Sequence, residues 1–112
     1  VYGLGEQTRD LTYINDMVSA FIIMGTDKKA IGQAVNFGTG IDIKIIDIAE
    51  KVKEYTNSNS EIIHLPERTS EVEKLLCNYN KAKELFGWEP TVLIDEGIKR
   101  SIKWVKSVYT TD

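Results

Sequence analysis

Two clusters, each centred on an arginine, are the residues of this chain that could do chemistry. Arg9 lies within Gly5–Asp10, and Arg68 opens the segment Arg68–Val72. A guanidinium group is planar, and its fork of N–H groups matches two anionic oxygens, so arginine suits a bidentate grip on phosphate. Two such groups, far apart in sequence, predict a clamp for one dianionic ligand such as the diphosphate of a nucleotide.

Each member of the proposed clamp also has a purely structural interpretation. Arg9 could be a strand residue paired with a surface carboxylate, an interaction that contributes about 0–1 kcal/mol. Arg68 is predicted to lie in a loop, because Pro66 ends the preceding strand, and ligand contacts concentrate in such loops. Glu71 could accept hydrogen bonds from a ribose diol, or it could be an acid in the first turn of a helix.

Two further motifs resemble cofactor or catalytic sequences but lack parts of them. Gly38–Gly40 has the start of a G-x-G-x-x-G loop, but Ile43 stands where the third glycine belongs, which favours a tight turn. Tyr79 and Lys83 have the Tyr-x-x-x-Lys spacing of a dehydrogenase base, yet no cofactor loop precedes them. We therefore assign no catalytic and no cofactor-binding residue from these motifs.

Composition excludes several classes of function. The 112 residues are 42% hydrophobic and 28% charged, as in an ordinary soluble globular domain. The net charge of -3 argues against a nucleic acid polymer as partner. Cys77 and His64 are each the only residue of their type, so neither a disulfide framework nor a two-histidine zinc motif is expected. Apolar runs are short and interrupted by charges, so we expect no membrane span and no signal peptide, and a cytoplasmic location.

The elements that must position the two arginines alternate between strands and helices, which favours an α/β fold of mixed layers. Strands are predicted over Leu11–Ile14, Gln33–Phe37 and Glu61–Leu65. Helices are predicted from Asn15 to Met24, over Ile45–Tyr55, from Asn80 to Phe86 and over Ile94–Tyr109. Asn15 and Asn80 are expected to cap their helices, and Gly87 is expected to be left-handed. Phe86, Trp88 and Trp104 are expected to form the core around the last helix.

Read in order, these segments resemble the C-terminal part of the extended short-chain dehydrogenase/reductase family, namely its NAD-dependent nucleotide-sugar epimerases and dehydratases. The stretches that carry the resemblance are Gly3–Asp16, Asn36–Gly40, Arg68–Val72, Lys81–Pro90 and Glu96–Ile98. One departure is Lys44, which stands where a Ser or Thr usually starts a helix, with Asp42 as a substitute cap. The sequences of these motifs resemble those of 4,6-dehydratases slightly more than those of 4-epimerases.

The resemblance implies that residues 1–112 are the smaller, nucleotide-sugar-binding domain of a longer enzyme, a small mixed α/β segment whose Rossmann core is absent. The start at Val1, directly in strand-like sequence, also predicts a fragment. In the family, arginines matched by Arg9 and Arg68 hold the diphosphate, and the acid matched by Glu71 contacts ribose. NAD and the catalytic tyrosine belong to the missing N-terminal domain, and the full-length enzyme is expected to be a homodimer.

Two other interpretations remain open from the sequence. The chain could be a non-catalytic interaction module that retains the family's structural motifs and uses its open apolar faces to bind a partner. It could also be only marginally folded by itself and ordered by contacts with other chains.

Overall fold

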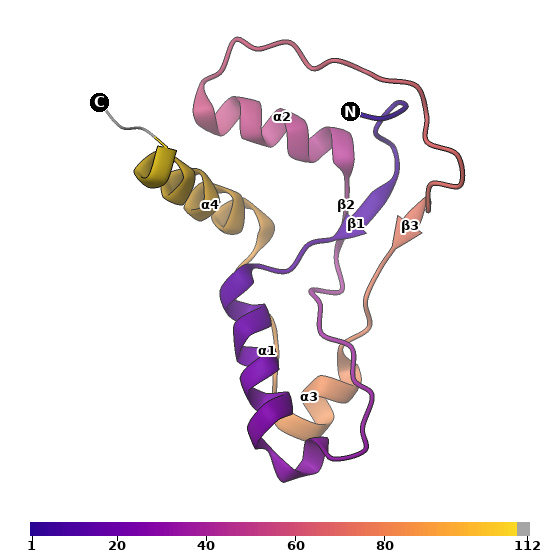
Figure 1. The fold of residues 1–112 in the computed structure, drawn as a ribbon, viewed down its shortest axis with the longest axis vertical. Coiled ribbons are helices and arrows are strands. Elements are labelled where there is room, and N and C mark those ends of the chain that lie inside the picture. The colour runs from indigo at the N-terminus through magenta and orange to yellow at the C-terminus, as the bar shows by residue number, and fades with distance from the viewer. Residues whose placement is uncertain (110–112) are drawn as a thin grey trace.

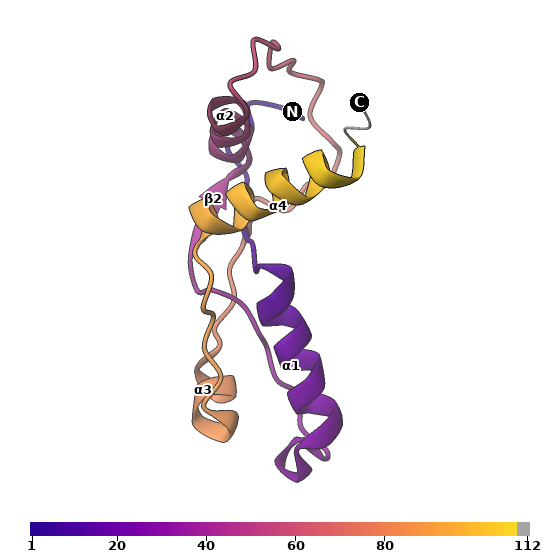
Figure 2. The ribbon, with the colours of Figure 1, turned by 90° about the vertical axis from the view of Figure 1, so that its left-hand side faces the viewer.

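The computed structural model describes residues 1–109, which form a small sheet with helices at both of its ends (Figure 1). In chain order the elements are β1 (Thr8–Asp10), α1 (Ile14–Thr26), the 3-10 helix η1 (Lys28–Ala30), β2 (Asp42–Lys44), α2 (Ile45–Thr56), β3 (Lys74–Leu75), α3 (Asn80–Phe86) and α4 (Ile94–Tyr109). Helices α2 and α4 pack together, and α1 and α3 lie on the opposite side of β2 from α2 (Figure 2). The molecule is flat, with extents of 49 × 40 × 19 Å. The α/β fold class is confirmed.

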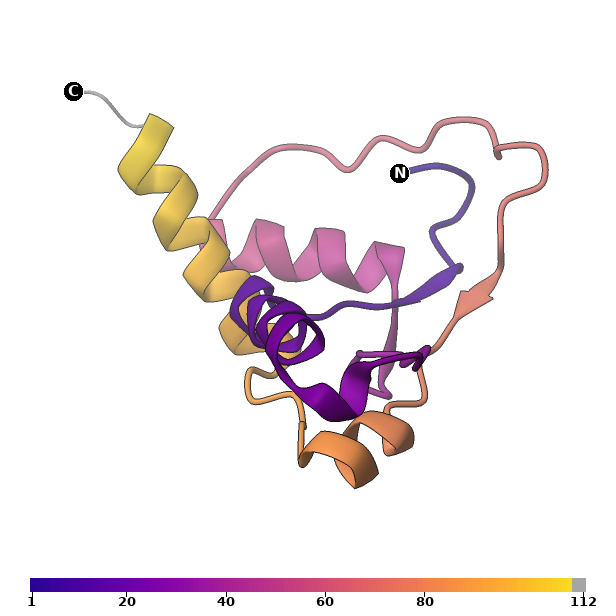
Figure 3. The same ribbon diagram turned by 60° about the horizontal axis from the view of Figure 1, so that its bottom comes forward.

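The sheet places Arg9 at its centre. The strand order is β2-β1-β3. β1 runs antiparallel to β2, with Arg9 opposite Ile43, and parallel to β3, with Arg9 opposite Leu75. The long connection from α2 to β3 arches around the N-terminal segment before it enters the sheet (Figure 3). This topology brings the segment that carries Arg68 alongside the segment that carries Arg9.

The four predicted helices are all present, but their caps differ from the prediction. Helix α1 starts at Ile14, one residue before Asn15, and has no side-chain cap. Asp42 does not cap α2, because it lies in β2 and pairs with Lys74 at 3.1 Å. Asn80 is the first residue inside α3 rather than its cap, and its amide donates to the Asn78 side chain at 2.9 Å. Gly87 ends α3 with φ of 68°, as predicted.

The predicted strands are mostly wrong. The first strand is β1, upstream of Leu11–Ile14, and Gln33–Phe37 joins no ladder among residues 1–109. Glu61–Leu65 contributes only one isolated bridge, from Leu65 to Tyr2. A strand exists only where a second strand accepts its hydrogen bonds, and apolar, β-branched composition does not reveal that partner. β2 and β3 are too short to show a two-residue period.

The core is small and lies between α1 and α3. Ala20, Ala82 and Trp88 are its buried members. The Trp88 ring meets Phe37 edge-on at a centroid distance of 5.0 Å. Trp104, predicted to be core, is 60% exposed because its part of α4 extends beyond the packed layer. Such a small core leaves much apolar surface uncovered in a chain of this size.

Two aspartates tie distant segments together. Asp16 is only 4% exposed and accepts hydrogen bonds from the amides of Thr91 and Val92, both at 3.0 Å. Burial raises the pKa of Asp16, but hydrogen bonds from Thr91 and Val92 outweigh burial and hold it below its ordinary value. Asp10, at the end of β1, accepts from the Gly40 amide at 2.8 Å and the Cys77 amide at 3.2 Å. These carboxylates fix both ends of the β1-to-α1 connection.

Candidate functional site

A hollow of about 540 Å³ opens between the N-terminal segment and the loop that precedes β3. It is lined by Tyr2, Gly3, Leu4, Glu6, Gln7, Glu67, Arg68, Ser70, Glu71 and Glu73. Two of the three predicted site residues, Arg68 and Glu71, therefore lie in one hollow. Arg9 is not among the lining residues, but it is joined to the hollow through Glu71, as described below.

Backbone pairing with the N-terminal segment positions the loop. The Gly3 amide donates to the Leu65 carbonyl at 2.9 Å, and the Leu65 amide donates to the Val1 carbonyl at 2.7 Å. The preceding residue, His64, has its Nδ1 at 2.8 Å from the Gly3 carbonyl oxygen. Pro66 then ends the pairing, and Arg68 lies in a loop, as the sequence predicted. Glu71 also lies outside any helix, so the first-turn interpretation of this acid is wrong.

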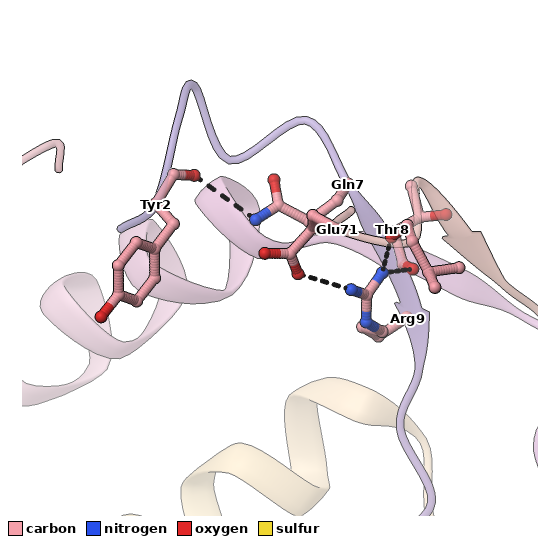
Figure 4. Close-up of polar contacts among 6 residues, drawn as sticks. Tyr2, Gln7, Thr8, Arg9 and Glu71 are labelled. Carbon is pink, nitrogen blue, oxygen red and sulfur yellow. Dashed lines mark hydrogen bonds and ion pairs between the residues drawn. The ribbon is translucent and has the colours of Figure 1, made fainter. Parts of the chain in front are cut away.

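Arg9 is held by contacts to the loop across the sheet (Figure 4). Its Nη2 donates to Oε1 of Glu71 at 2.8 Å, and its Nη1 donates to the carbonyl oxygens of Thr8 and Val72, each at 2.8 Å. The arginine side chain is 21% exposed. An arginine has five N–H groups, and in the described part of the chain the Nε–H and one Nη2–H of Arg9 have no hydrogen-bond partner.

Arg68 has a different environment. Its guanidinium carbon lies 3.8 Å from the centroid of the Tyr2 ring, within the range of a cation–π interaction. A hydrogen bond with the Tyr2 side chain is the main cause that raises the pKa of Arg68 above its ordinary value. Its side chain is exposed at the hollow. Arg68 is therefore a charged group that the Tyr2 side chain contacts through its ring and through a hydrogen bond.

Carboxylates dominate the rest of the lining. Glu6, Glu67, Glu71 and Glu73 all face the hollow, against the single cation Arg68. Glu6 is neutralised in part by Lys44 at 3.2 Å, and Glu71 by Arg9 at 2.8 Å. Carboxylates accept hydrogen bonds and cannot donate them when ionised. Hydroxyl groups of a ligand would therefore find hydrogen-bond acceptors in this lining.

The weaker motifs have structural explanations. Gly38–Gly40 forms a turn around the Asp10 carboxylate, which accepts from the amides of Thr39 at 2.9 Å and Gly40 at 2.8 Å. Burial is the main cause that raises the pKa of Cys77, and the Asp10 charge adds to it, so this thiol is a poor nucleophile. Lys83 forms an ion pair with Glu89 at 2.7 Å.

Tyr2 and Gln7 are two of the lining residues that were not among the predicted site residues. The Gln7 amide donates to the Tyr2 carbonyl at 3.4 Å (Figure 4), and the Tyr2 ring contacts Arg68. Both contacts depend on the fold, because nothing in the local sequence of Tyr2 indicates a cation from a remote loop. The sequence offered one signal for Gln7, its position inside the Gly5–Asp10 cluster.

Residues 1–101 match the family described as GDP-mannose 4,6 dehydratase. A curated relative, the UDP-N-acetyl-alpha-D-glucosaminuronate decarboxylase of Bacillus cytotoxicus, is 32% identical over 96% of this chain and 35% of its own length. The chain thus spans about a third of the length of this relative.

Solved structures with the same fold include the epimerase Mth375 of Methanothermobacter thermautotrophicus. It superposes with a TM-score of 0.91 at 32% identity over 96% of this chain and 32% of its own. The UDP-glucuronic acid 4-epimerase of Bacillus cereus, solved with UDP-glucuronic acid and NAD, superposes with a TM-score of 0.87 at 27% identity over 97% of this chain and 35% of its own. The superposition covers the arrangement of the sheet and helices described above.

Proposed function

Because this chain belongs to the GDP-mannose 4,6-dehydratase family, within the extended short-chain dehydrogenases/reductases, we propose that it is the nucleotide-sugar-binding portion of an NAD-dependent epimerase or dehydratase. In this proposal residues 1–112 form the C-terminal domain of a longer enzyme. This chain aligns with only about a third of the length of each of these relatives, which supports this division.

The observation that carries the proposal is the shared neighbourhood of Arg68, Glu71 and Arg9. Arg68 and Glu71 line one hollow, and Glu71 bonds Arg9 through Oε1. A diphosphate would take the N–H edges of the two arginines. Oε2 of Glu71, which has no partner within residues 1–109, would accept a hydroxyl of the ribose.

We assign NAD and the catalytic groups to the part of the enzyme outside this chain. The Bacillus cereus relative was solved with NAD as well as with its nucleotide sugar. The open apolar face of α1 supports a missing layer, since Ile14, Val18, Phe21 and Ile22 are all exposed, Phe21 by 72%. We also propose, from the family resemblance alone, that the complete enzyme is a homodimer.

The test is nucleotide-sugar binding by the complete protein, measured by calorimetry with a panel of UDP-glucuronic acid, UDP-glucose, GDP-mannose and dTDP-glucose. Charge-assisted hydrogen bonds contribute about 1.5–3 kcal/mol each. Arg68→Ala should therefore lower the affinity for the tightest-binding ligand by about tenfold or more, since tenfold corresponds to about 1.4 kcal/mol. Arg100→Ala is the matched control, because Arg100 pairs with Glu96 on α4, away from the hollow.

Two results would contradict the proposal. The first is unchanged affinity in the Arg68→Ala variant. The second is a failure of every ligand in the panel to bind, together with tight self-association in light scattering. That second result favours the interaction module instead, in which the apolar face of α1 is the interface.

A further inference from the structure

We propose that Tyr2 is a positioning residue for Arg68, a ring that holds the guanidinium group over the hollow with its N–H edge ready for an anion. The inference rests on the proposed function of this hollow, and it adds a residue that the arginine clamp alone does not include.

The first observation is the stacked contact itself. The guanidinium carbon of Arg68 lies 3.8 Å from the centroid of the Tyr2 ring, and both side chains line the same hollow. The attraction between a cation and an aromatic ring acts through the ring face. An arginine bound in this way has fewer orientations to lose when a ligand arrives, so part of the entropic cost of binding is already met before the ligand binds.

The second observation is the contrast with Arg9. Arg9 is held by an ion pair to Glu71 and by two carbonyl oxygens, contacts that use three of its N–H groups. Contact with the ring face uses no N–H group, because the N–H groups lie in the guanidinium plane, and the hydrogen bond to the Tyr2 side chain occupies part of that plane. Nor does a ring neutralise the positive charge as a carboxylate does. Tyr2 thus fixes Arg68 and leaves its charge and most of its N–H groups available.

The third observation is that Tyr2 is itself anchored to the chain that leads to Arg68. Tyr2 forms a parallel bridge with Leu65, and its carbonyl accepts from Gln7 at 3.4 Å. The next residue, Gly3, has φ of +58°, and a Cβ there would lie only 2.7 Å from Cγ of Glu67. The N-terminal segment is therefore pressed against the loop, and the ring follows the loop that carries the arginine.

A double-mutant cycle in the complete protein tests the inference. The variants are Tyr2→Leu, Tyr2→Phe, Arg68→Ala and the double variant Tyr2→Leu with Arg68→Ala. Affinity for the tightest-binding nucleotide sugar of the panel is measured by calorimetry. Tyr109→Leu, which removes a ring that is 73% exposed on α4, is the matched control.

We expect Tyr2→Leu to weaken binding by about threefold to tenfold, the range given by a partly exposed cation–π contact. Tyr2→Phe keeps the ring and should remain within about twofold of the wild type. In the Arg68→Ala background, Tyr2→Leu should cause no further loss, because the ring acts only through the arginine.

Equal losses from Tyr2→Leu in both backgrounds would overturn the inference, since the ring would then act on the fold in general. No loss from Tyr2→Leu in the wild-type background would also overturn it. Unchanged affinity in Arg68→Ala alone would instead overturn the proposed function. If Tyr2→Leu lowers the melting temperature, Tyr2→Trp replaces it. Binding within about twofold of the wild type, or tighter, supports positioning, and any larger loss contradicts it.

Discussion

The carboxylate of Glu71 lies 2.8 Å from the guanidinium of Arg9, although the two residues are 62 positions apart in the chain. Arg9 comes from the central strand of the sheet, and Glu71 comes from the loop that lines the hollow. Both side chains are partly buried, with 21% and 27% of their surfaces exposed. The ion pair therefore links the sheet to the surface of the hollow.

Glu71→Gln tests the role of that carboxylate. The amide keeps the shape of the side chain but loses its charge, so Arg9 loses its ion-pair partner and a ribose hydroxyl loses a strong acceptor. We expect nucleotide-sugar binding to weaken by about threefold to tenfold, that is, about 0.7–1.4 kcal/mol. Calorimetry on the complete protein measures the change.

Glu73→Gln is the control for Glu71→Gln. Glu73 lines the same hollow but forms no ion pair with Arg9. Its substitution should change the affinity by less than about twofold. Equal effects of the two substitutions would show that only the general charge of the lining matters, and the specific role of Glu71 would be lost.

Gly38→Ala should destabilise the protein. A Cβ at Gly38 would lie 2.3 Å from Cβ of Cys77 and 3.0 Å from Oδ2 of Asp10. Relief of that overlap has to move the turn held by Asp10, at a cost of about 1–3 kcal/mol. Gly25→Ala is the control, since Gly25 lies in α1 and its added Cβ meets nothing within 4 Å. Gly25→Ala should stabilise the protein by about 0.5–1 kcal/mol. Urea unfolding measures both variants, and the reverse order of stability would contradict the packing of the turn at Gly38.

Asp16→Asn should also be destabilising, by about 2–4 kcal/mol. The buried carboxylate accepts hydrogen bonds from the amides of Thr91 and Val92 and from the Thr91 hydroxyl, and an amide group cannot accept all three. The free energy of unfolding at neutral pH measures this loss.

The pH dependence of stability gives a second test of Asp16. Its pKa is lowered in the folded protein from the ordinary value of 3.8. A group whose folded pKa is depressed contributes stability above its unfolded pKa, and that contribution is lost as the pH falls through the folded pKa. The wild type should therefore lose more stability than Asp16→Asn as the pH falls below about 4. Parallel pH profiles for the two proteins would contradict the assignment.

The helices could be predicted from the sequence because each carries its own signal. The apolar spacing from Ile94 onward places α4 over Ile94–Tyr109, and Gly87 marks the left-handed end of α3. The strands could not be predicted, because pairing partners are set by tertiary structure. Gln33–Phe37 has strand-like composition and no ladder in the described part of the chain, whereas the two residues of β3 pair only because β1 lies beside them.

The candidate site was predictable in part for the same reason. The break at Pro66 placed Arg68 in a loop, and that placement is confirmed. The Arg9–Glu71 ion pair and the Tyr2–Arg68 contact each join the N-terminal segment to a loop in the middle of the chain. Contacts of this kind have no local pattern, so the sequence indicated the participants Arg9, Arg68 and Glu71 but not how they meet.

The most direct test of the arginine clamp is a crystal structure of the complete protein with its tightest-binding nucleotide sugar. We predict that the diphosphate oxygens lie within about 3.2 Å of guanidinium nitrogens of both Arg9 and Arg68. A diphosphate bound elsewhere, with either guanidinium turned away from it, would contradict the clamp.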